Sequence, residues 1–229
     1  IILSQKTKLK HPPQTEKEQR TSTDNRQIRL DVYAIDEDDV IYEVEAQKEN
    51  THNLSKRSRL YQGIIDSKLL PPGVVDFNLL NEVLIVLIMP FDLFGYGLYR
   101  YTFHMRCEEV PELKLNDGAT RIFLNTRGKH PELVSQELIE LLKYMERSTD
   151  EVSRECKSKR IQEMHRRVCQ IKASEKAEVK YMQTWEEKIL IKQAGIAEGE
   201  QIGRLKEKTE LVKKLSNKLQ KCWRLIFPK

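Results

Sequence analysis

Residues Ile28 to Gln47 constrain the fold more than any other stretch, because they are typical of two β-strands joined by an acidic turn. Side chains alternate between the two faces of an extended strand. In the first strand, the even-numbered side chains therefore form an apolar row that we expect to face a core: Ile28, Leu30, Val32 and Ala34. In the second strand, one face carries three side chains with acceptor oxygens: Glu43, Glu45 and Gln47.

The register of this hairpin decides which residue lies opposite Asp31. If Ile35 pairs with Ile41 across a five-residue loop, Asp31 lies opposite Glu45. If the loop is only the four acidic residues Asp36 to Asp39, Asp31 lies opposite Val44 and faces away from the glutamates. The apolar pattern favours the first register, because it groups the small apolar side chains of both strands on one side.

In the first register two carboxylates lie side by side, and they repel each other unless a cation intervenes or one of them keeps a proton. Mg²⁺ takes oxygen ligands, commonly one or two carboxylates with water and a substrate phosphate. The pattern is therefore compatible with a Mg²⁺ site. From the pattern alone, an acidic sheet face that only contacts water is the simpler interpretation.

Several motifs occur in order along the chain: RLDVYAIDEDDVIYEVEAQ, LSKRSRLYQGIID, VLIVLIMPFDLFGYGLYRYTF and RIFLNTRG. Together they resemble the PD-(D/E)XK nuclease family transposases, also called recombination-promoting nucleases. The resemblance covers about half the chain, from Ile28 to Met145. It implies an α/β fold with a restriction-endonuclease-like core, a mixed β-sheet flanked by helices, and a Mg²⁺-dependent endonuclease that hydrolyses DNA phosphodiester bonds.

The resemblance also implies roles for individual residues. Asp31 matches the aspartate of the family motif, Glu45 matches its second acid, and both would bind Mg²⁺. Gln47 stands where the motif usually has lysine; it can orient water or phosphate by hydrogen bonds but has no charge to stabilise a developing oxyanion. Four residues of the next predicted helix would lie near the active site and contact DNA or support the site: Arg57, Arg59, Tyr61 and Gln62.

We predict three segments. Residues 1–27 are polar and read as a disordered or extended arm, residues 28–147 form the nuclease-like core, and residues 148–229 form a basic helical extension. Relatives with the full fold are expected to have helices before the first core strand. This sequence has no such pattern there, so we predict a core that lacks its N-terminal helices.

Other predicted elements surround the hairpin. The pattern indicates a helix from Leu54 to Leu69 capped by Thr51 or Asn53, and a strand from Glu82 to Met89 buried on both faces. Strands are also predicted over 98–107 and 120–125, and a helix from Pro131 to Met145. In the loop PFDLFGYG, Asp92 reads as a residue that hydrogen-bonds the backbone of a turn rather than a metal ligand, and the lone His104 reads as structural.

Charge is distributed unevenly. Residues 1–149 carry 20 Lys/Arg and 23 Asp/Glu, net −3, whereas residues 150–229 carry 20 and 12, net +8. A basic segment favours DNA as a partner, although soluble basic helices have the same composition. Apolar residues at helical spacing in this extension also predict a coiled coil or homo-oligomer: Ile161, Met164, Val168, Ile171, Leu205, Leu211, Leu215 and Leu219.

The four cysteines, Cys107, Cys156, Cys169 and Cys222, lack zinc-site spacing and favour a reducing, cytoplasmic environment. The longest apolar run, Val83 to Met89, is far shorter than the roughly 20 residues of a membrane helix. We therefore expect no membrane partner. Two alternatives to an active nuclease stay open: a truncated, catalytically inactive relative, and a non-enzymatic DNA-binding or self-associating protein.

Overall fold

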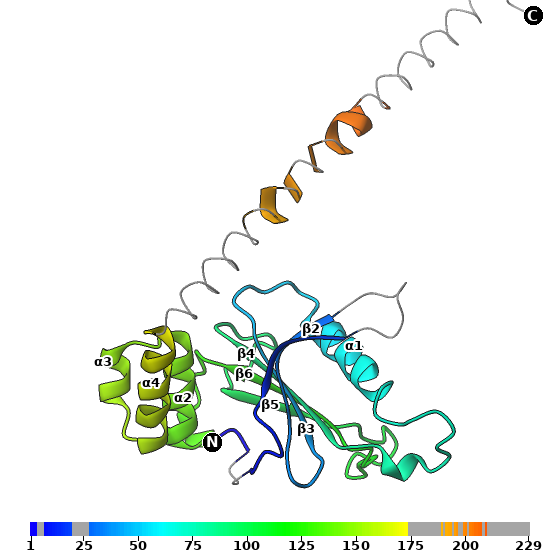
Figure 1. The fold of residues 1–229 in the computed structure, drawn as a ribbon, viewed down its shortest axis with the longest axis horizontal. Helices are drawn as coiled ribbons and strands as arrows, with labels where there is room; N and C mark the ends of the chain where they lie inside the picture. Colours follow the sequence, from blue (N-terminus) through cyan, green and yellow to red (C-terminus); the bar gives the residue numbers. More distant parts are fainter. Residues whose placement is uncertain are drawn as a thin grey trace, which may run out of the picture. The chain divides into compact units, whose positions relative to one another are not determined.

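The computed structural model describes residues 1–3, 7–19, 28–173, 189, 191–193, 195–196, 199–200, 202–207 and 209. The chain divides into two compact units, Ile1–His165 and Arg166–Lys229. The first unit contains a six-stranded mixed sheet with helices on both faces, so the chain has the predicted α/β architecture (Figure 1).

The strand order in the sheet is β1-β2-β3-β4-β6-β5. β3, β4 and β6 are parallel, while β1, β2 and β5 each run antiparallel to their neighbour. The central strand β4 has the sequence VLIVLIM, and its uninterrupted apolar run matches burial on both faces. The strands are β1 (Gln14–Gln19), β2 (Ile28–Ile35), β3 (Ile41–Ala46), β4 (Val83–Met89), β5 (Arg100–Phe103) and β6 (Ala119–Asn125).

The β2–β3 hairpin has the register that the apolar pattern favours, because Ile35 pairs with Ile41 and Val32 with Val44. Asp36 holds the acidic turn together. Its Oδ1 accepts the backbone N–H groups of Asp38 and Val40 at 3.0 and 2.9 Å, and its Oδ2 accepts the Tyr42 hydroxyl at 2.7 Å. The turn therefore satisfies its own backbone through one buried carboxylate.

The predicted apolar row of β2 is wrong beyond Asp31. Ile28 and Leu30 belong to the same core cluster as Tyr33 and Ile35, so the core-facing positions change from even to odd numbers at Asp31. The β1–β2 register does not shift here, since Thr15 lies opposite Val32 and Lys17 opposite Leu30, but Glu16 between Thr15 and Lys17 has a positive φ of 53° instead of an extended backbone. Strict alternation, on which the prediction depends, does not hold where the backbone of a strand pair departs locally from the extended conformation.

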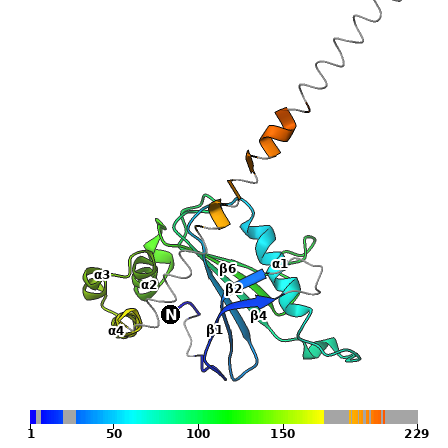
Figure 2. The same cartoon turned by 45° about the horizontal axis from the view of Figure 1, so that its top comes forward.

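Each face of the sheet has its own core. Helix α1 (Leu54–Asp66) covers one face, and its buried Leu54, Ile64 and Ile65 pack in one cluster with residues of β2, β3 and β4. The opposite face is covered by α2 (Gln136–Glu146), α3 (Asp150–Glu155) and the first turns of α4 (Lys159–Lys172), through Leu142, Val152 and Ile161 among others. Figures 1 and 2 show α1 and these helices on opposite sides of the sheet.

The structure adds detail at two of the predicted segments. Within the arm 1–27, residues Gln14–Gln19 form the edge strand β1, which pairs with β2 through its backbone although its side chains are polar. The basic extension was predicted to begin at 148, but Val152, Cys156 and Ile161 are buried in the α2-side core. These helices complete the first unit, which ends at His165.

Smaller differences follow from local chemistry. α1 ends at Asp66 instead of Leu69, with Asn53 at its N-cap position, and β5 is shorter than the predicted strand 98–107. Pro131 does not open the long helix. Residues Pro131–Leu133 form a 3₁₀ turn, and α2 begins at Gln136, because Ser135 is extended and its side chain accepts the Leu138 N–H.

In the loop after β4, Asp92 has the predicted turn role: its carboxylate accepts N–H groups of Phe94 and Gly97 and the Tyr101 hydroxyl. In the described part of the second unit, residues 202–207 are helical, and Leu205 is exposed. The other predicted stripe positions of that region, Leu211, Leu215 and Leu219, and also Cys222, lie outside the described residues. No described helix is long and apolar enough to cross a membrane.

Candidate functional site

A cluster of carboxyl groups lies where β2 and β3 face α1. Glu43 and Glu45 follow Ile41 on the α1-facing side of β3, and their parallel neighbours in β4, Ile85 and Leu87, are buried core residues. This placement removes both glutamates from water: Glu43 is 0% exposed and Glu45 is 7% exposed. Carboxylates are rarely buried so completely without a charged or hydrogen-bonding partner.

Asp31 joins this cluster from β2. Asp31 directly precedes Val32, which pairs with Val44, and the Asp31 side chain accepts the backbone N–H of Ala46 at 3.2 Å. Its charge is near enough to Glu43 and Glu45 to contribute to raising the pKa of both. The three carboxyl groups do not bring three oxygens within 4.8 Å of one another, so this part of the chain forms an open acidic cluster.

Arg57 of α1 supplies the cation of the cluster. Its Nη2 donates to the Glu45 carboxylate and, at 2.7 Å, to the side-chain oxygen of Gln47. The side chain is only 23% exposed, so this is a largely buried ion pair. Gln47 thus links β3 to α1, and a positive charge lies beside the position where the resemblance expects a lysine.

Burial dominates the electrostatics of the cluster. It raises the pKa of Glu43 to about 8, with further increases from the charges of Glu45 and Asp31 that Arg57 only partly offsets. Burial also raises the pKa of Glu45, although the charge of Arg57 opposes this. Without an added cation, Glu43 therefore retains its proton at neutral pH, which reduces the repulsion inside the cluster.

Buried oxygens without a partner among the described residues indicate that the cluster can bind an additional cation or water. Both carboxyl oxygens of Glu43 and Oε2 of Glu45 are buried and have no hydrogen-bond partner among the described residues. Such atoms carry a desolvation cost that a bound cation or water would relieve. The cluster is therefore suited to hard cations, which prefer oxygen ligands.

The other predicted site residues divide into two groups. Tyr61 and Gln62 are buried on the sheet-facing side of α1, and burial followed by the charge of Glu45 raises the pKa of Tyr61 to about 12. Gln62 donates to Asp66 at 2.8 Å and leaves its own buried Oε1 without a partner among the described residues. Arg59 is exposed on the far side of α1 and does not join the cluster.

Glu43 is the site residue that sequence reasoning missed. It shares a strand face with Glu45 and Gln47 at a spacing of two residues, and this signal was visible in the sequence. What the sequence did not show is that Glu43 lies deeper in the core than Glu45. Among the residues of the hairpin, the resemblance assigned a role only to Asp31, Glu45 and Gln47.

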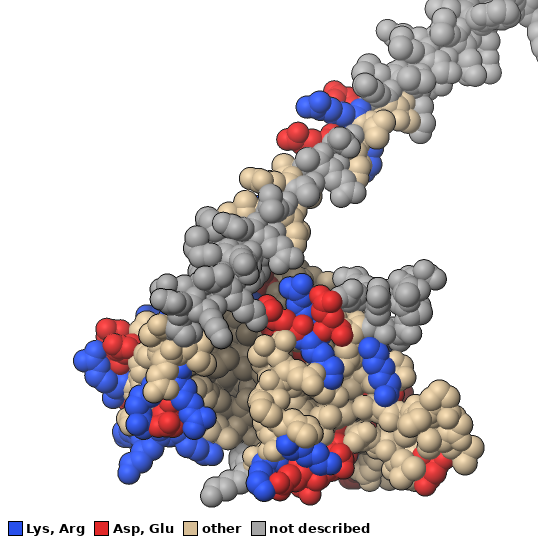
Figure 3. Space-filling model, viewed as in Figure 1, with Lys and Arg blue, Asp and Glu red and all other residues tan. Residues whose placement is uncertain are grey.

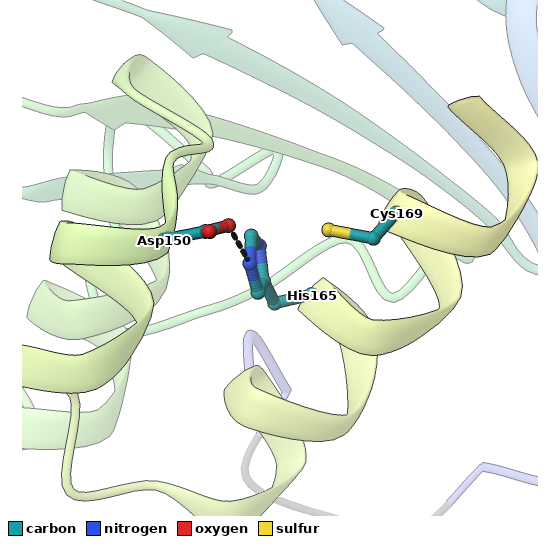
Figure 4. Close-up of side chains that lie close together, drawn as sticks. All are labelled: Asp150, His165 and Cys169. Atoms are coloured by element: carbon teal, nitrogen blue, oxygen red, sulfur yellow. Dashed lines mark hydrogen bonds and ion pairs between the residues drawn. The ribbon is translucent and has the colours of Figure 1, made fainter. Parts of the chain in front are cut away.

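A second polar contact involves His165 in the first unit (Figure 4). Its Nε2 lies 2.8 Å from Asp150 of α3, and its Nδ1 lies 3.1 Å from the Tyr144 hydroxyl of α2. Both ring nitrogens are thus engaged in joining three helices, which indicates a structural role. Cys169, also drawn in Figure 4, belongs to the second unit.

The surface over helices α2, α3 and α4 carries basic and acidic side chains together (Figure 3). Several of its cations are paired, as in Lys143 with Glu155 at 2.5 Å and Arg160 with Glu137. Paired charges attract a polyanion less than free ones. This surface therefore gives weaker support for a nucleic-acid interface than the composition of the extension alone.

No protein-family model matches this chain, and neither a curated protein nor a solved structure matches it.

Proposed function

We propose that this chain is a Mg²⁺-dependent DNA endonuclease of the PD-(D/E)XK transposase, or recombination-promoting nuclease, type. The observation that carries the proposal is the acidic cluster itself. Asp31 of β2 accepts the backbone N–H of Ala46, the residue after Glu45 on β3, and buried carboxyl oxygens of Glu43 and Glu45 lack partners among the described residues. The mixed sheet with helices on both faces is compatible with a restriction-endonuclease-like core.

The residues of the cluster fit Mg²⁺. Asp31 and Glu45 would hold the ion, which commonly binds one or two carboxylates and keeps several waters. When bound, Mg²⁺ lowers the pKa of a coordinated water and neutralises charge on the phosphate. The raised pKa of Glu43 adds a nearby group that can take up or release a proton near neutral pH.

The remaining residues position the substrate in this proposal. Gln47 offers an amide that orients a water or a phosphate oxygen, and Arg57 provides the positive charge that Gln47 lacks. A guanidinium binds phosphate as readily as carboxylate, so Arg57 can exchange Glu45 for a DNA phosphate. Arg59, exposed on the same helix, is suited to a more distant backbone phosphate. Hydrolysis would leave free DNA ends, which can promote recombination.

One observation favours an alternative. Arg57 pairs with Glu45 and Gln47 in the structure, so a cation of the protein already neutralises part of the cluster. A chain in which this pair is permanent would be a catalytically inactive relative that retains DNA binding or self-association without cutting. We therefore propose that the Arg57–Glu45 ion pair opens when metal and DNA bind.

A plasmid-cutting assay distinguishes these functions. We expect supercoiled DNA to be nicked with Mg²⁺ and not with a chelator, and we expect Asp31→Asn and Glu45→Gln to abolish cutting while the fold is retained. Glu49→Gln, an exposed change beyond the same strand, is the matched control. Cutting that survives both site changes would refute the assignment, and DNA binding without cutting by the unchanged chain would support the inactive alternative.

A further inference from the structure

A cavity lies at the edge of the sheet where its three parallel strands end. Its volume is about 380 Å³. Its lining includes the last residues of β3 and β4, Ala46 and Met89, and the residue that follows β6, Thr126. The hydrogen bonds between the parallel strands extend to residues that line the cavity. The Gln47 N–H donates to the Ile88 carbonyl oxygen at 2.9 Å, and the Thr126 N–H donates to the Met89 carbonyl oxygen at 2.8 Å. Ligands of open α/β sheets characteristically bind outside the carboxyl ends of the strands.

Three cations line this cavity: Lys48 after β3, Arg127 after β6 and Arg147 at the end of α2. Glu146 is the one acid in the lining, and both of its oxygens are engaged. Oε1 accepts Nε and Nη2 of Arg127 at 2.9 and 2.7 Å, and Oε2 accepts the Thr126 hydroxyl at 2.6 Å. Within the described residues, the Lys48 and Arg147 side chains form no hydrogen bond or ion pair, although the charge of Arg147 contributes to lowering the pKa of Glu146 and of Glu155. Both side chains can therefore donate to an anion.

The rest of the wall is largely apolar. Met145, which is 42% exposed, contributes a flexible thioether side chain that packs well against aromatic rings, and the partly exposed Pro90 lies in the same wall. A ligand that matches both parts has an anionic group next to a flat, weakly polar body. A nucleotide has this combination, with its phosphate for the cations and its base for the apolar wall.

The cavity also adjoins the acidic cluster through one residue. Gln47 lines the cavity, and its side-chain oxygen accepts Arg57 of the cluster. A strand whose phosphate lies at Glu45 and Gln47 would therefore bring a neighbouring nucleotide to the cavity. The choice of a nucleotide over other phosphate-bearing ligands rests on the proposed nuclease function.

We propose that this cavity binds one nucleotide unit, with its phosphate on Lys48 and Arg147 and its base against Pro90 and Met145. The unit comes either from a free mononucleotide or from a nucleic-acid strand that continues to the acidic cluster. Because the apolar wall offers no fixed pattern of base-specific donors, the cavity accepts different bases, as stacking sites do.

Fluorescence anisotropy with a labelled single strand of about ten nucleotides tests the proposal, within the size that such sites usually cover. The full chain is measured in chelator, so that no cutting occurs. Lys48→Ala/Arg147→Ala is compared with Lys114→Ala/Lys159→Ala, which removes the same charge at exposed positions outside the cavity. Unlabelled deoxyadenosine monophosphate, deoxyadenosine and inorganic phosphate compete in separate arms, and circular dichroism checks the fold of each variant.

We expect the cavity variant to bind about tenfold more weakly and to lose about 0.7 from the slope of log affinity against log salt, as for one phosphate contact on a single strand. The control variant should match the unchanged chain. If the monophosphate competes as effectively as the unlabelled strand, the cavity binds free nucleotides. If the monophosphate competes much more weakly, the cavity binds a nucleotide of a strand. Competition by inorganic phosphate equal to the monophosphate, or equal affinity of the two double variants, overturns the proposal.

The outcomes of the binding test and of the cutting assay can be distinguished. If Asp31→Asn abolishes cutting but the cavity variant binds like the control, only the nucleotide cavity is refuted. If the cavity variant loses binding while no Mg²⁺-dependent cutting is detected in the unchanged chain, the cavity is supported and the nuclease assignment is refuted.

Discussion

Arg57 donates through its Nη2 to the side-chain oxygen of Gln47 at 2.7 Å, and the same nitrogen binds the Glu45 carboxylate. One guanidinium from α1 thus joins two residues at the end of β3. This relationship gives the acidic cluster a cation of its own, and it makes the stability of the metal-free chain depend on residues that we assign to the site.

Arg57→Ala should destabilise the metal-free chain. The change leaves Glu45 buried without its partner, which typically costs about 3–5 kcal/mol in the free energy of unfolding. Arg59→Ala, on the exposed side of the same helix, should change it by no more than about 0.5 kcal/mol. Urea denaturation in chelator measures both. Added Mg²⁺ should restore part of the loss in Arg57→Ala, and equal stability of the two variants would contradict the buried ion pair.

Glu43→Gln should change the pH dependence of stability. The folded-state pKa of Glu43 is raised to about 8 from an ordinary value of 4.5, so the native chain holds a proton that the unfolded chain releases. The contribution of Glu43 is fully favourable below about pH 4.5 and is lost as pH rises toward 8, by at most about 1.4 kcal/mol per pH unit.

The glutamine variant lacks this loss. Its free energy of unfolding, relative to the unchanged chain, should therefore increase from pH 5 to pH 8 in chelator. Glu49→Gln, at an exposed position, should run parallel to the unchanged chain at every pH. A constant difference between Glu43→Gln and the unchanged chain would show that Glu43 is ionised in the folded state.

Asp36→Ala should destabilise the hairpin that carries Asp31 and Glu45. The buried Asp36 carboxylate accepts three hydrogen bonds, from Asp38 N–H, Val40 N–H and the Tyr42 hydroxyl. Bonds to a charged group contribute about 1.5–3 kcal/mol each, and they are not additive, so we expect a loss of a few kcal/mol. Asp38→Ala, in the same turn, should have little effect.

A spectroscopic readout follows from the same contact. Burial, followed by the hydrogen bond to Asp36, raises the pKa of Tyr42 to about 12. In Asp36→Ala the absorbance titration of one tyrosine should therefore move to lower pH. An unchanged tyrosine titration would show that the Asp36–Tyr42 contact does not form.

Gly128→Ala and Gly63→Ala should have opposite effects. A Cβ at Gly128 would overlap the ring of Tyr99, so the variant must displace an aromatic side chain. We expect this to cost about 1–3 kcal/mol, the usual range for overpacking. At Gly63, in the middle of α1, a Cβ meets no atom within 4 Å, and alanine should stabilise the helix by up to about 1 kcal/mol. Thermal unfolding of both variants measures these effects. Destabilisation by Gly63→Ala would contradict the exposed position of Gly63 on α1.

The sequence by itself determined the elements that depend on local pattern. Alternation and the acidic turn predict the β2–β3 hairpin and its register, the unbroken apolar run predicts the buried strand β4, and the turn chemistry of Asp92 is readable from its neighbours. These features depend on side chains only a few residues apart, or on a period of two that a slip of one residue would reverse.

Only the tertiary structure decided what lies across the strands and helices. The polar segment Gln14–Gln19 is a strand because β2 offers it unpaired backbone groups, and Val152 and Ile161 belong to the first unit because the α2 face of the sheet needs cover. The burial of Glu43 and the contact of Arg57 with Gln47 depend on how α1 packs on β3. Burial and long-range pairing are properties of the assembled chain, and local sequence does not contain them.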